Sequence, residues 1–160
     1  MEKETEQELI KRMIGFQKEE ITSSIIYQKL AAKEKNPHNR EILQRIAEDE
    51  RRHYATLRGY THQDVSPNRF EICFYVWLVR LLGATFAVRR LELGEKETSG
   101  VYSQYPSMEH FAEMARDEQH HEEKLIEMID EERLQYMGSV VLGLNDALVE
   151  FTGRFHAGAE

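Results

Sequence analysis

Two stretches of the chain decide its fold: LQRIAEDERRHYATL at residues 43–57 and FAEMARDEQHHEEKLIEM at residues 111–128. In both, apolar residues recur every three or four positions, which is the pattern of a helix that buries one face. One turn of each apolar stripe is replaced by a polar pair, Glu50 with His53 and Glu118 with His121. Each stretch therefore predicts a helix that carries a carboxylate and an imidazole into the interior of the protein.

Proline, glycine and other turn residues divide the chain into four long helices, which we expect at residues 6–34, 37–58, 69–102 and 107–137. Pro37 suits the first turn of the second helix, and Ser107 can cap the start of the fourth. Gly59 and Gly138 are the expected ends of the second and fourth helices. No stretch alternates as a strand does, so the sequence predicts an all-α four-helix bundle with a short C-terminal tail.

Length and composition exclude several classes of protein. The 160 residues suit one domain with a real core, and a hydrophobic fraction of 41% excludes a disordered chain. With a single Cys, neither a disulfide framework nor a cysteine-built metal site can form. A net charge of -8 argues against a nucleic-acid partner. No signal peptide opens the chain, so we expect a cytoplasmic protein.

The other two long helices also carry acids into their apolar stripes, Glu20 in the first helix and Glu92 with Glu95 in the third. A buried carboxylate without a counter-charge is too costly to be kept for packing alone, and no Lys or Arg occupies these stripes. Two divalent cations would balance the acids, because oxygen and imidazole donors suit such ions. The predicted metal ligands are Glu20, Glu50, His53, Glu92, Glu95, Glu118 and His121.

Residues next to these ligands are expected to have ordinary roles. Asp117 and His120 form an alternative acid–histidine pair at the same spacing, but their stripe is charged, so we expect both to face solvent. We expect Glu19 to face solvent as well. Tyr27 and Tyr102 are expected as core aromatic residues. Cys73 is expected as a small buried residue. The remaining histidines lack a partner at ligand spacing and are expected on the surface: His38, His62, His110 and His156.

The motifs Glu50-Arg-Arg-His53, Glu92-Leu-Gly-Glu95 and Glu118-Gln-His-His121 resemble the ligand motifs of the ferritin-like di-iron superfamily, within its rubrerythrin branch. The resemblance covers about residues 8–137 and implies a ferritin-like bundle over residues 1–137. It also implies that Glu92 and Glu95 of the third helix allow one iron to exchange ligands when its redox state changes. A single Cys cannot build the rubredoxin domain that usually supplies electrons to a rubrerythrin peroxidase.

The tail, residues 138–160, contains GLNDALVEFTG at residues 143–153, which resembles the start of the first membrane helix of the vacuolar-iron-transporter family. Proteins that fuse a rubrerythrin-like domain to such a transporter have this layout, so the resemblance implies a membrane iron-transporter partner. The chain ends seven residues later, and the tail alone suggests a short packing helix. Its apolar residues fall on one side: Met137, Val140, Leu144, Leu148, Phe151 and Phe155.

The donor set suits iron or manganese better than copper, and we expect a centre of two Fe ions for which Mn or Zn can substitute. The predicted function is binding of Fe(II) and its oxidation by O2 or H2O2. Glu50 and Glu118 are the candidate bridging ligands, and Glu20 is expected on one ion only. The alternatives are a non-catalytic iron-binding or sensing module that serves a membrane iron transporter, and a helical scaffold without metal.

Residues 70–88 are apolar almost all round, but Glu71 and Arg80 interrupt them and disfavour a membrane span. The surplus apolar face predicts contact with a second subunit. In a ferritin-like arrangement, Phe70 would lie about 33 Å along its helix from Glu92. The preceding connection would have to bridge roughly 40 Å with about a dozen residues. We therefore expect a homodimer, in which exchange of helix pairs would relieve that span.

Overall fold

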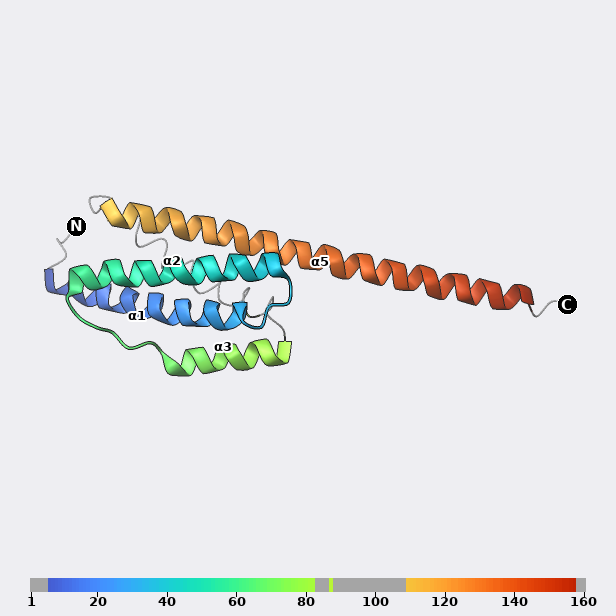
Figure 1. The fold of residues 1–160 in the computed structure, drawn as a ribbon, viewed down its shortest axis with the longest axis horizontal. Helices are drawn as coiled ribbons and strands as arrows, with labels where there is room; N and C mark the ends of the chain where they lie inside the picture. Colours follow the sequence, from blue (N-terminus) through green and yellow to red (C-terminus); the bar gives the residue numbers. More distant parts are fainter. Residues whose placement is uncertain (1–5, 83–86, 88–108, 158–160) are drawn as a thin grey trace. The chain divides into compact units, whose positions relative to one another are not determined.

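The computed structural model describes residues 6–82, 87 and 109–157 of the chain. The helices whose bounds lie there are α1 (Glu6–Ala31), α2 (Pro37–Thr61), α3 (Arg69–Leu82) and α5 (Glu109–Ala157) (Figure 1). This described part contains no strand. The fold is all-α and consistent with a ferritin-like helical bundle, which confirms the predicted fold class. The positions of Ser107, Tyr102 and the predicted ligands Glu92 and Glu95 lie outside the described residues.

Both ends of α2 follow from local backbone chemistry. Asn36 caps the start, with its Oδ1 accepting from the backbone N–H of His38 at 2.9 Å, and Pro37 occupies the first turn as predicted. The predicted end at Gly59 is wrong, because α2 continues to Thr61. The chain turns at His62, which has a left-handed φ of 52° and donates its N–H to the carbonyl of Arg58. Glycine ends a helix only where the backbone takes that conformation, and here it does so three residues later.

The apolar stripes that the sequence predicts are buried. In α2, Leu43, Ile46 and Leu57 are at most 2% exposed, and the polar pair Glu50 and His53 is buried between them. In α5, the pair Glu118 and His121 is buried in the same way, with these apolar neighbours: Phe111, Met114 and Leu125. Met13 of α1 and Leu57 of α2 pack with Phe111 and Met114 of α5 into one apolar cluster. Each such side chain contributes about 1.5–3 kcal/mol by leaving water.

Helix α3 packs against α1 of the same chain and buries Ile72, Tyr75 and Leu78. One sequence expectation fails here, because Cys73 is exposed rather than buried. Leu81 of the same helix is also 61% exposed. Because this helix is apolar on most sides, its sequence pattern does not single out the face that packs.

Helix α5 does not end at Gly138, so that prediction is also wrong. The helix runs on to Ala157, and a Cβ at either Gly138 or Gly143 would meet no atom within 4 Å. The chain divides into two compact units, Met1–Leu125 and Ile126–Glu160. In the second unit α5 exposes Leu134, Met137 and Leu144. Among the described helices, none combines the length and the hydropathy needed to cross a membrane.

Replacement of Gly59 by Ala tests the position of the end of α2. Gly59 lies inside the helix with open space around its Cα, so Gly59→Ala should stabilise the protein by about 0.5–1 kcal/mol. Urea unfolding followed by circular dichroism measures the change. A loss of stability of similar size would instead place Gly59 at a left-handed helix terminus, and would contradict the observed boundary.

Candidate metal centre

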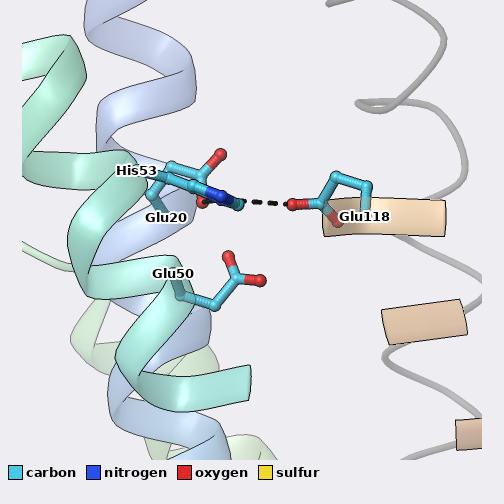
Figure 2. Close-up of side chains that lie close together, drawn as sticks. All are labelled: Glu20, Glu50, His53 and Glu118. Carbon is cyan, nitrogen blue, oxygen red and sulfur yellow. Dashed lines mark ion pairs between the residues drawn. The ribbon is translucent and has the colours of Figure 1, made fainter. Parts of the chain in front are cut away.

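Four buried side chains from three helices converge inside the first unit (Figure 2). They are Glu20 of α1, Glu50 and His53 of α2, and Glu118 of α5, and each is at most 9% exposed. Each offers one ligand atom, and these atoms all lie within 4.8 Å of one another. The Nδ1 atom of His53 lies 3.4 Å from Glu20 Oε2 and 3.4 Å from Glu118 Oε1. The group could hold a metal ion, because carboxylate and imidazole are common ligands of iron and manganese.

His121 of α5 adjoins this group. Its Nδ1 atom lies 3.2 Å from Glu50 Oε1, and the His121 and His53 ring centroids are 6.2 Å apart. Each histidine therefore faces a glutamate of the other helix of the pair. Five of the seven predicted ligands are brought together: Glu20, Glu50, His53, Glu118 and His121.

The far side of each imidazole is held by an aspartate from the opposite helix. The Nε2–H group of His53 donates to Asp117 Oδ2 at 3.1 Å, and that of His121 donates to Asp49 Oδ2 at 3.1 Å. The prediction that Asp117 merely faces solvent is wrong, since this side chain is only 28% exposed and bonds His53. One sequence signal could have found both aspartates: each directly precedes its motif glutamate, so that Asp-Glu-x-x-His occurs twice.

Other expectations for single residues are met. Tyr27 is fully buried, whereas Glu19 is exposed beside the buried Glu20. His38, His62 and His110 are exposed, as is His120. The side chain of His156 is outside the part of the chain that is described.

Acidic neighbours dominate the electrostatics of His53. Burial by itself lowers the pKa of this imidazole, but Glu118, Glu20 and Asp117 outweigh burial and raise the pKa to about 10. Burial raises the pKa of Asp117, whereas His53 and Arg52 together lower it below its ordinary value. A proton on His53 therefore supplies part of the positive charge that the buried carboxylates require.

The donor atoms fit a metal centre. The Nδ1 atoms of His53 and His121 are buried, and neither makes a hydrogen bond in the described structure. Because the aspartates accept from Nε2–H, the neutral tautomer of each imidazole leaves its Nδ1 lone pair directed at the carboxylates. The arrangement thus presents nitrogen and oxygen donors from facing helices around one buried point.

The raised pKa of His53 predicts how the metal-free protein responds to pH. A group whose folded pKa of about 10 exceeds its ordinary value of 6.5 stabilises the fold fully below about pH 6.5. That stability is lost as pH rises towards 10, by at most about 1.4 kcal/mol per pH unit. Urea unfolding in chelator at pH 6, 8 and 10 measures the loss.

Two variants isolate the contribution of His53 from that of other groups. His53→Gln should flatten this pH dependence, whereas His62→Gln, which changes an exposed histidine, should follow the wild type. Equal pH dependence in wild type and His53→Gln would contradict the assignment.

The comparisons with known proteins bear on the first two helices. The family model described as Rubrerythrin matches residues 1–60, a segment that includes Glu20, Glu50 and His53. Neither the search of curated proteins nor that of solved structures found a match. Rubrerythrins typically bind iron, and the match confirms the predicted resemblance: the N-terminal part of this all-α chain is similar to the ferritin-like, rubrerythrin branch of the di-iron proteins.

Proposed function

We propose that this protein is a di-iron carboxylate protein that binds Fe(II) and oxidises it with O2 or H2O2. The observation that carries the proposal is the buried group of Glu20, Glu50, His53 and Glu118, to which His121 adds a second imidazole. The similarity of residues 1–60 to rubrerythrin supports iron as the metal. Two bound Fe(II) ions would supply two electrons, enough to reduce one H2O2 and two protons to two water molecules.

The chain's own residues have distinct roles in this proposal. Glu50 of α2 lies beside His121 of α5, and Glu118 of α5 lies beside His53 of α2. These two carboxylates are therefore our candidates for ligands that would bridge two ions. Glu20 lies beside His53 and would bind one ion only. His53 and His121 would supply the nitrogen ligands. Glu92 and Glu95 would complete the centre, in keeping with the rubrerythrin-like pattern of the third helix.

Burial of the site also contributes to the chemistry. Every candidate ligand in the described structure is at most 9% exposed, so little water screens the charged groups. Carboxylates in such a setting favour added positive charge, and they therefore favour the more oxidised form of a bound metal. Asp49 and Asp117 hold the imidazoles and should keep the ligands oriented as the charge changes.

A non-catalytic iron-binding or sensing module that serves a membrane iron transporter is the second candidate. Its support is α5, which extends to Ala157 and exposes Leu134, Met137 and Leu144 in its second half. Such residues are suited to contact with a further apolar element. Steady-state assays with an external reductant separate the two candidates. Repeated oxidant consumption favours an oxidoreductase, and a single stoichiometric uptake of iron favours the binding module.

We also propose that the protein is a homodimer. Helix α3 exposes Phe70, Trp77 and Leu81 at positions seven and four residues apart, which places them on one face. Light scattering at micromolar concentration should give the mass of two chains, and Trp77→Asp should lower it to that of one. Arg80→Asp, on the same helix, serves as the control for an added acid. A single-chain mass for the wild type would refute the dimer.

Anaerobic titration with Fe(II) tests the metal centre, and we expect two ions per chain. Glu20→Gln should lower the affinity for iron and slow its oxidation by H2O2 at least about tenfold, because a buried anionic ligand becomes neutral. Glu19→Gln is the matched control, since it makes the same change at the neighbouring exposed position. The proposal fails if the wild type binds no iron, or if both variants behave alike.

A further inference from the structure

One arginine connects the two aspartates that hold the imidazoles. Arg52 Nη1 lies 2.6 Å from Asp49 Oδ1, and Arg52 Nη2 lies 2.8 Å from Asp117 Oδ2. Asp49 accepts from His121, and Asp117 accepts from His53. An unbroken chain of hydrogen bonds therefore runs from one candidate ligand to the other, through a single guanidinium.

The planar guanidinium suits this position because two of its nitrogens donate in different, fixed directions. Asp49 lies on the same helix as Arg52, three residues earlier, whereas Asp117 lies on α5. Arg52 thus links α2 to α5 through the same two aspartates that accept from the imidazoles. Its side chain is 54% exposed and each aspartate is 28% exposed, so the link forms the outer edge of the site.

The link also breaks the symmetry of the two Asp-Glu-x-x-His motifs. In the second motif, His120 takes the place of Arg52, and it is exposed. Asp49 uses separate oxygens for its two partners, Oδ1 for Arg52 and Oδ2 for His121. Asp117 uses one oxygen, Oδ2, for both Arg52 and His53. The His53 imidazole therefore shares its acceptor oxygen with the Arg52 guanidinium, whereas the His121 imidazole has an acceptor oxygen to itself.

We propose that Arg52 is a positioning residue that orients both imidazoles at once by fixing their aspartate partners. This inference rests on the proposed function, since the oriented Nδ1 atoms are the candidate metal ligands. An exposed ion pair contributes little to the stability of a fold. The effect of Arg52 should therefore appear in the binding of metal rather than in folding.

Titration with Co(II), an anaerobic spectroscopic probe, tests this role in three variants of the full chain. Arg52→Gln removes the charge and both links. Arg52→Lys keeps the charge, but its single ammonium group cannot reproduce the two-directional fork. Arg51→Gln is the matched control, because it removes the same charge from the adjacent exposed position.

We expect Arg52→Gln to bind Co(II) about tenfold more weakly than wild type, as is typical when a partner of a ligand histidine is disturbed. Arg52→Lys should recover less than half of this loss on a logarithmic scale, and Arg51→Gln should match the wild type. Proton NMR of the Co(II) form gives a second readout. Two exchangeable, shifted Nε2–H signals should be sharp in wild type and broadened by solvent exchange in Arg52→Gln.

The outcomes separate this inference from the proposed function. If wild type binds no Co(II) and no Fe(II), the proposed function fails and the inference fails with it. If wild type binds Co(II) while Arg52→Gln keeps its affinity and sharp Nε2–H signals, only the inference fails. Full recovery by Arg52→Lys would show that charge suffices, and would overturn the bridging role. A lower melting temperature of Arg52→Gln with unchanged NMR signals would make Arg52 merely structural.

Discussion

Burial of carboxylates in a helical core is the constraint on which the rest of this structure depends. Glu20, Glu50 and Glu118 lie where a helical bundle normally places apolar side chains, and each would cost several kcal/mol if it stayed charged without a partner. Imidazole nitrogens lie 3.2–3.4 Å from their oxygens. A proton on His53 relieves part of the repulsion, and a divalent cation in the same place would relieve more. The demand for positive charge at this point therefore links the fold to the proposed chemistry.

The groups around the site are ordered by their exposure. The carboxylates and imidazoles are buried, the aspartates that accept from the imidazoles are partly exposed, and Arg52 lies at the surface. In our proposal Arg52 fixes the two aspartates, and the aspartates fix the imidazoles. Each aspartate accepts from one nitrogen of an imidazole, which leaves the other nitrogen to face the buried carboxylates. This order is the reason why we expect a charged surface residue to affect metal binding at a buried site while contributing little to stability.

The second half of α5 poses a different physical problem. A bundle helix normally exposes polar residues, yet Leu134, Met137 and Val141 are all exposed within two turns. Gly138 and Gly143 lie in the same stretch and do not interrupt the helix. Apolar surface of this kind is suited to contact with a further apolar element.

The sequence by itself determined that the chain is helical and which faces of α1, α2 and the first part of α5 are buried, because a 3.6-residue period is a local property. It also identified the five candidate ligands that the structure brings together. Only the structure decided where α2 and α5 end, since Gly59 and Gly138 act as stops only where the backbone turns left-handed, and it does not do so there. It also decided which face of the apolar α3 packs.

The partners of Asp117 depend on another helix in the same way. His53 and Arg52 lie more than sixty residues away in sequence, so the charged stripe of α5 predicted solvent for this aspartate. A sequence pattern records which residues share a face of one helix. The pairing of an aspartate with the histidine of a facing helix arises only when the two helices pack.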